Sequence, residues 1–146
     1  MELIKEINDG KEISNPEDVY KYLEEFINED REYFIVLGLT IKNKVLYRDI
    51  VSIGTLDCST LHPRETFKSA CMKSASKIII AHNHPSGDPN PSNEDNEVFY
   101  DFKKAGEILG IEIIDGIIIG EDGVYSQKNE GIIKIEDIKK KQTTTL

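Results

Sequence analysis

The sequence has few cysteines and no long apolar run, and both shortages narrow what the protein can be. Cys58 and Cys71 are its two cysteines, and they form no C-x-x-C pair. This indicates free thiols in a cytosolic protein rather than a disulfide framework. No segment approaches the roughly 20 apolar residues that a membrane span requires. The first residues also lack a signal-peptide pattern, so the sequence predicts a cytoplasmic protein without membrane attachment.

Basic residues are outnumbered, and this disfavours one class of partner. The formal net charge is −9 and the sequence pI is about 4.8. A protein that binds phosphate backbones needs a basic surface, because neutralising phosphates supplies most of its non-specific affinity. The one basic cluster is Lys139–Lys141, near the end of the chain. Direct nucleic-acid binding is therefore not expected, and nothing in the sequence indicates an oligomeric state.

The chain also lacks internal repeats and linkers, which favours a single domain. Its 146 residues, 38% of them hydrophobic, are enough to bury a core. We expect an N-terminal helical segment over residues 1–31, packed on an α/β domain over 32–133. Residues 134–146 are expected to be a frayed tail.

Hydrophobic periodicity predicts the order of elements along the chain. The pattern indicates an α/β sandwich, in which helices enclose a mixed β-sheet. The isoleucine run within "KIIIAHNH" predicts a strand that is buried on both faces. Helices are expected near residues 14–30, 62–75 and 92–110, and strands near 33–41, 44–54, 77–84, 111–120 and 123–127.

One stretch, "AHNHPSGDPNPSNED" at residues 81–95, contains two of the three histidines. His82 and His84 end a predicted strand, where residues two apart point to the same face. Asp95 follows a proline-glycine loop and could fold back toward them. Two imidazoles and one carboxylate leave a fourth tetrahedral position open for water, which is the arrangement of catalytic zinc sites.

The same residues also have a purely structural interpretation. "SNED" is a capping box, with Ser92 at the N-cap and Asp95 three residues later. An H-x-H pair is common in strands without metal, and "HPSGDPNP" by itself predicts a turn. The two interpretations are compatible, because one serine can cap a helix and also face a metal site.

The complete spacing, H-x-H, seven residues, Ser, two residues, Asp, resembles the JAMM signature of MPN-domain metalloproteases. With "HPRE" upstream, it is similar to the RadC branch of that superfamily over roughly residues 30–128. The resemblance implies a cytidine-deaminase-like fold and one Zn²⁺ per chain, with His82, His84 and Asp95 as ligands. It further implies that Ser92 hydrogen-bonds near the metal water and stabilises the oxyanion.

JAMM enzymes also use an upstream glutamate as general base. Glu65 of "HPRE" is the first candidate, and Asp49 in the second predicted strand is the alternative. Glu65 also occupies the first turn of a predicted helix, where the helix dipole favours a carboxylate in any case. His62, Arg64 and Ser86 are expected to contact substrate.

Two departures from the RadC pattern affect the expected activity. RadC proteins usually carry Asp-His where this chain has Asp115-Gly116, which indicates a different or weaker action on substrate. Longer RadC proteins place a helix-hairpin-helix module before this domain, and this chain resembles a short form without it.

The sequence leaves three functions open. The first is a zinc-dependent hydrolase that cleaves a peptide, isopeptide or related amide bond, with a peptide or protein conjugate as substrate. The second is a non-enzymatic RadC/MPN scaffold or DNA-repair accessory protein. The third, a metal-dependent nuclease, is disfavoured by the acidic charge and by a single-metal ligand set. Scaffold versions of the fold generally lose metal ligands, so the intact set favours the first function.

Overall fold

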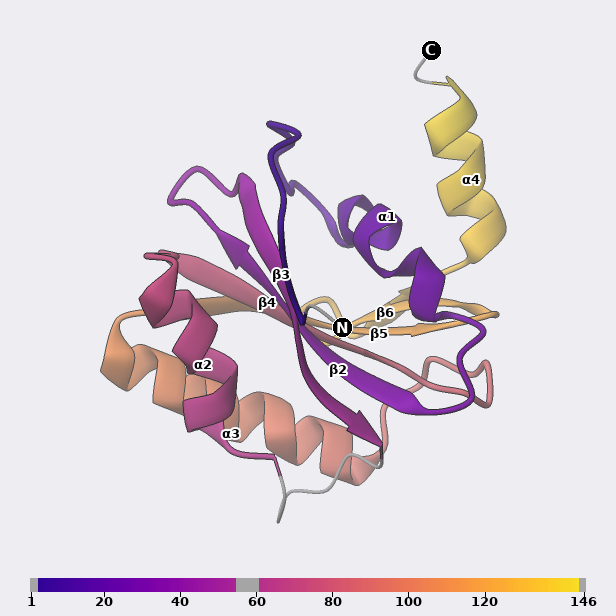
Figure 1. Ribbon diagram of the computed structural model, residues 1–146. Coiled ribbons are helices and arrows are strands. Elements are labelled where there is room, and N and C mark those ends of the chain that lie inside the picture. The colour runs from indigo at the N-terminus through magenta and orange to yellow at the C-terminus, as the bar shows by residue number, and fades with distance from the viewer. Residues whose placement is uncertain (1–2, 55–60, 145–146) are drawn as a thin grey trace.

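Seven strands form one mixed β-sheet in the computed structural model, which describes residues 3–54 and 61–144 (Figure 1). The strand order across the sheet is β1-β3-β2-β4-β5-β6-β7. β4 and β5 run parallel, and the other neighbouring pairs are antiparallel. The strands are β1 (Ile4–Glu6), β2 (Glu32–Leu39), β3 (Val45–Gly54), β4 (Lys77–Asn83), β5 (Glu112–Gly120), β6 (Gly123–Ser126) and β7 (Gly131–Ile133).

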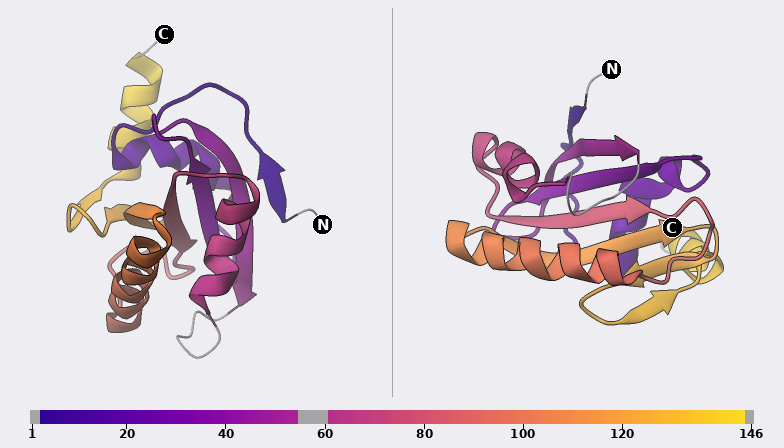
Figure 2. Two further views of the ribbon diagram at one scale, coloured as in Figure 1. Left: turned by 90° about the vertical axis from the view of Figure 1, so that its left-hand side faces the viewer. Right: turned by 90° about the horizontal axis from the view of Figure 1, so that it is seen from below.

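Helices cover both faces of this sheet, as the sequence predicted (Figure 2). α2 (Pro63–Met72) and α3 (Asn93–Leu109) pack on one face. The other face is covered by α1 (Tyr20–Leu23) and by α4 (Ile135–Thr144). Each face buries a hydrophobic cluster of its own, so the sheet forms the middle layer of an α/β sandwich.

The isoleucine run in β4 occupies the centre of the sheet, which confirms that prediction. Ile78 and Ile80 point into the cluster beneath α2 and α3, whereas Ile79 points into the opposite cluster. None of the three is more than 4% exposed. A strand between parallel and antiparallel neighbours, with helices on both sides, has to be apolar on both faces.

The N-terminal segment is helical but less regular than expected. Two short 3-10 helices, η1 (Pro16–Val19) and η2 (Glu24–Phe26), flank α1. The buried side chains of Val19, Leu23 and Phe26 keep a helical spacing against the sheet. β1, which the sequence did not predict, adds a short edge strand to β3.

The C-terminal segment differs from the expected frayed tail, because it forms α4. Ile138 of α4 is 1% exposed and belongs to the cluster that includes α1. Lys141 Nζ also lies 2.7 Å from Glu17 Oε1 of η1. Cys71 is an exposed free thiol, and Cys58 lies outside the described residues.

The sheet topology brings several segments to one edge. β3 and β4 are both antiparallel to β2, and β5 is parallel to β4. The C-terminal ends of β3, β4 and β5 therefore lie along the same side of the sheet. β2 and α3 both begin there (Figure 1). Within residues 3–54 and 61–144, no helix is long and apolar enough to cross a membrane.

Candidate metal centre

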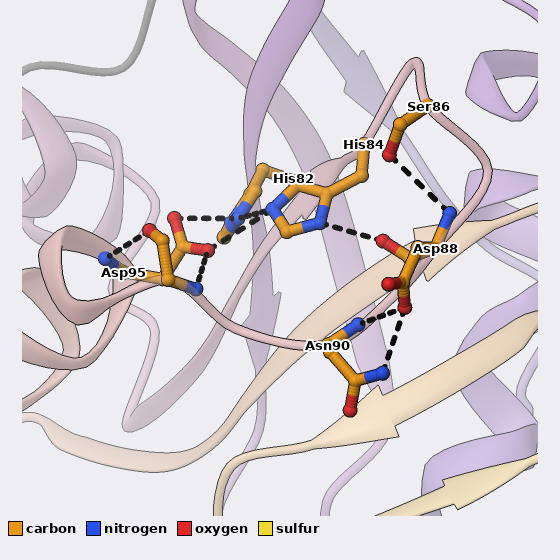
Figure 3. A network of polar contacts seen from close by, with 7 residues as sticks. His82, His84, Ser86, Asp88, Asn90 and Asp95 are labelled. Carbon is orange, nitrogen blue, oxygen red and sulfur yellow. Dashed lines mark hydrogen bonds and ion pairs between the residues drawn. The ribbon is translucent and has the colours of Figure 1, made fainter.

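The end of β4 supplies the two histidines of the candidate site (Figure 3). His82 is the penultimate residue of β4, and His84 directly follows the strand. Strand alternation turns both side chains toward the face covered by α3. Their Nε2 atoms lie 3.3 Å apart, as the sequence predicted for two imidazoles that could share an ion.

Asp95 reaches the histidines from the first turn of α3. Its Oδ1 lies 3.1 Å from His82 Nε2, and its Oδ2 lies 3.0 Å from His84 Nε2. The side chains of His82, His84 and Asp95 are 9%, 14% and 8% exposed. The fold therefore brings together, in one buried cluster, the three residues that the sequence singled out.

The predicted capping box is also present and holds Asp95 in place. Ser92 Oγ accepts a hydrogen bond from the Asp95 backbone N–H at 3.1 Å. The Ser92 N–H donates to Asp95 Oδ2 at 2.8 Å. Since one carboxylate serves both the cap and the histidine cluster, folding of the α3 N-terminus also orients the third ligand.

The proline-glycine loop orients the ring of His84. His84 Nδ1 lies 2.8 Å from the carbonyl oxygen of Asp88, a contact in which Nδ1 is the donor. This bond leaves the Nε2 lone pair of the neutral ring directed at the cluster. Asp88 is itself held by its N–H to Ser86 Oγ and by Asn90, which donates twice to Asp88 Oδ1 (Figure 3).

The pKa values of Asp95 and His84 are shifted in directions that suit a site for a metal ion. Burial alone would raise the pKa of Asp95, but hydrogen bonds to His82 and His84 outweigh it and hold that pKa well below its usual range. Burial alone would lower the pKa of His84, but bonds to Asp95 and the Asp88 carbonyl raise it above its ordinary value. The carboxylate is therefore charged, and it stabilises positive charge at the two imidazoles, whether this is a proton or a cation.

The spacing of the donor atoms fits tetrahedral zinc. With Zn–N bonds of about 2.0–2.1 Å, two ligands on a tetrahedron lie roughly 3.3 Å apart. The separation of 3.3 Å between the two Nε2 atoms is close to that value. Each of these nitrogen atoms also lies within 3.1 Å of one Asp95 carboxylate oxygen. Two imidazoles and a carboxylate also form a suitable donor set for zinc.

The "HPRE" residues are at the start of α2, and none of them belongs to the cluster of His82, His84 and Asp95. Arg64 and Glu65 have side chains that are 75% and 55% exposed, with 4.0 Å between Arg64 Nε and Glu65 Oε1. Glu65 lines a cleft between α2 and β3, whereas His82 and Asp95 line only a very small cavity beneath α3. His62 is the N-cap residue of α2, and its side chain makes no capping hydrogen bond.

Asp49, the alternative base, lies deeper in the sheet. It pairs with Val36 of β2 and is 8% exposed. Because β2 separates β3 from β4, Asp49 is about 10 Å from β4. Burial raises its pKa, although the hydrogen bond with Ser69 opposes that shift. Asp49 therefore belongs to the packing beneath α2 rather than to the histidine cluster.

Glu32, which the sequence pattern did not single out, lies on the histidine side of the sheet. Phe34 pairs with His82 across β2 and β4, and continuing that register places Glu32 opposite His84. Phe34 faces the α3 side of the sheet, and strand alternation turns Glu32 the same way. The charge of Glu32 contributes to raising the pKa of His84, as expected for a nearby carboxylate. The signal available in the sequence was the position of Glu32 two residues before Phe34, because residues two apart in a strand share a face.

Gly116 of β5 lines the cleft beside His82 and Asp95. A Cβ atom there would lie 2.7 Å from Phe99 Cδ1 and 3.1 Å from Gln127 Cγ. The space that a histidine would need is therefore filled by an α3 aromatic ring and by the Gln127 side chain.

Comparisons with known proteins agree with this geometry. The model of the RadC-like JAB domain matches residues 13–132. A UPF0758 protein of Methanosarcina mazei is 48% identical over 125 residues, which cover 85% of this chain and 55% of that protein. A UPF0758 protein of Desulforamulus reducens is 50% identical over 119 residues, covering 81% of this chain and 52% of that protein. One from Bacillus cereus is 48% identical over 122 residues, covering 83% and 54%. The chain thus spans about half the length of these curated relatives.

Proposed function

We propose that this chain, which belongs to the RadC-like JAB domain family, is a zinc-dependent hydrolase of the JAMM type that cleaves a peptide, isopeptide or related amide bond. The observation that carries the proposal is the convergence of His82, His84 and Asp95. Their three donor atoms suit zinc and leave a fourth position for a ligand that takes part in chemistry. Bound there, zinc would supply Lewis-acid activation of a water whose pKa falls to about 7.

Glu32 is the general base in this proposal, in place of Glu65. Extension of the β2–β4 register beyond the Phe34–His82 pair places it near His84, on the face to which the ligands point, whereas Glu65 lines a cleft between α2 and β3. The Glu32 carboxylate takes a proton from the attacking water and passes it to the leaving amine. Glu32 is half-buried, so its carboxylate can meet both the site and an incoming substrate.

Ser92 stabilises the developing charge on the substrate carbonyl oxygen. Its Oγ already accepts the N–H of Asp95, which leaves the hydroxyl proton available to donate. Ser92 is exposed at the start of α3, next to the ligand it caps. Such a donor is fixed before the reaction, so it stabilises the transition state without reorganisation.

We infer a peptide or a protein conjugate as the substrate. Ser86, exposed on the loop that orients His84, is the substrate contact nearest the ligands in the chain. His62 and Arg64 at the start of α2 are more distant candidates. The acidic net charge of −9 argues against phosphate-backbone substrates.

A scaffold or DNA-repair accessory role is the second candidate function. A binding module has no need of three mutually hydrogen-bonded ligands, of which two are buried and one is half-buried. Burying an aspartate and two histidines away from water is costly unless they are paired or hold an ion. The intact ligand set therefore favours hydrolysis over a purely structural role.

The test is hydrolysis of a panel of peptide and isopeptide substrates by the zinc-loaded protein. We expect cleavage of at least one member, loss of activity with a chelator, and recovery when zinc is added back. Zinc-loaded protein that cleaves none of them, while binding a member of the panel unchanged, would favour the scaffold role.

A further inference from the structure

Asn83, the residue between the two histidines, is fully buried, with 0% of its surface exposed. As the last residue of β4, it points to the face opposite His82 and His84 by strand alternation. It is therefore unable to act as a third ligand from β4. A buried amide must satisfy its own donors and acceptor, and the partners of Asn83 show what it holds.

Both ends of the Asn83 amide bind the beginning of β2. Asn83 Oδ1 accepts a hydrogen bond from the Tyr33 backbone N–H at 2.7 Å. Asn83 Nδ2 donates to the Arg31 carbonyl oxygen at 2.9 Å. These two backbone groups lie on either side of Glu32.

The strand ladder itself does not fix this part of β2 to β4. Pairing between β2 and β4 runs from Leu39–Lys77 to Phe34–His82 and goes no further. Beyond Phe34, the Asn83 side chain takes over the role of the ladder bonds on that side. β3 holds the other side through the pairing of Glu32 with Gly54.

We propose that Asn83 is a positioning residue, which fixes the backbone around Glu32 so that this carboxylate stays beside the metal ligands. The proposal rests on the assignment of Glu32 as general base. The end of β4 then supplies two metal ligands on one face. On the other face it supplies the Asn83 amide, which holds the backbone around Glu32. Residues 82–84 thereby fix the distance between the metal ligands and the Glu32 carboxylate, because they carry both histidines and the amide that holds Glu32.

The test uses the full chain loaded with cobalt(II), whose visible absorption reports both binding and the ionisation of the water that the ion holds. A nearby carboxylate disfavours that ionisation. We expect Glu32→Gln to lower the pH midpoint of the absorption change by about 1 pH unit. Asn83→Ala should lower it in the same direction while cobalt still binds with unchanged stoichiometry.

Leu39→Ala is the control for general destabilisation. Leu39 is fully buried at the far end of β2, so its loss weakens the fold without moving Glu32. Its midpoint should equal that of the wild type. If Asn83→Ala does not fold, Asn83→Ser, which keeps one hydrogen-bonding atom, replaces it with the same expectation.

The possible outcomes distinguish a failure of the role proposed for Asn83 from a failure of the proposed function. A wild-type midpoint in the Asn83 variants, together with a lowered one in Glu32→Gln, would overturn the role of Asn83 and leave the proposed function intact. No shift in any variant would overturn both Asn83 and the assignment of Glu32. Failure of the wild type to bind cobalt would instead overturn the metal site and the proposed function.

Discussion

His82 and His84 aim their Nε2 atoms at a common point, with 3.3 Å between them. One oxygen of the single Asp95 carboxylate lies against each ring. A divalent cation would stabilise this arrangement, whereas protonation of both rings would place two positive charges side by side. The local sequence produces it directly, because side chains two apart in a strand share a face.

Asp95→Asn should lower zinc affinity by at least about 100-fold. Loss of a metal ligand lowers the affinity more than loss of a residue that hydrogen-bonds to a ligand. Isothermal titration of metal-free protein with zinc measures this. Glu94→Gln is the matched control, because it removes the same charge from the same turn of α3. Equal affinities for the two variants would show that Asp95 only caps the helix.

Glu32→Gln and Glu65→Gln distinguish the two candidate bases. The first should slow hydrolysis at least about 100-fold, because a positioned base contributes that much or more, and zinc content should not change. The second should retain nearly full activity, because Glu65 is exposed and lines another cleft. The reverse pattern would restore Glu65 as the base.

Zinc binding should weaken as the pH falls. The pKa of His84 is raised above its ordinary value in the metal-free protein, and zinc must displace that proton. In the metal-free protein, the stability contributed by His84 is fully present below about pH 6.5, its unfolded pKa. That contribution is lost as the pH rises through the higher folded pKa. The increase in melting temperature caused by zinc should therefore shrink between about pH 8 and pH 6, as differential scanning fluorimetry can show. An increase that stays constant over this range would contradict the proton displacement.

Gly116→Ala should destabilise the fold by about 1–3 kcal/mol, because overpacking a filled core costs that much. The added Cβ would lie 2.7 Å from Phe99 Cδ1. In a Phe99→Leu background the same change should cost less, because the ring has gone. Urea unfolding of the four proteins in this cycle measures the difference. The same cost in both backgrounds would mean that Phe99 is not what excludes a side chain at 116.

The parts of the site that sequence predicts are local. The H-x-H pair, the capping box and the loop between them lie within fifteen residues, so strand alternation and helix-start chemistry place them. Glu32 was not singled out because its position depends on the pairing of β2 with β4, in which Phe34 meets His82, 48 residues later. Glu65 was favoured for its motif and stays a prediction, although its side chain lines the cleft between α2 and β3.

The fold, too, was predicted where it depends on local pattern and not where it depends on distant contacts. The long periodic strands and the helices α2 and α3 were predicted with small errors at their ends, since the pattern of burial is present in their own residues. The helix expected near residues 14–30 is instead divided into η1, α1 and η2. β1 and β7 have three residues each, too few for a pattern. α4 was taken for a frayed tail because its packing depends on Ile138 reaching the cluster that includes α1, and nothing in its own composition indicates that contact.

The metal centre is tested most directly by the zinc content of protein purified without chelator, measured by elemental mass spectrometry. We predict about one zinc per wild-type chain, as for a single tetrahedral site, and its loss in His84→Ala. His62→Ala, which changes the one histidine outside the cluster, should retain the metal. Wild-type protein that holds no zinc, even after zinc is added back, would contradict the metal centre and the function proposed for it.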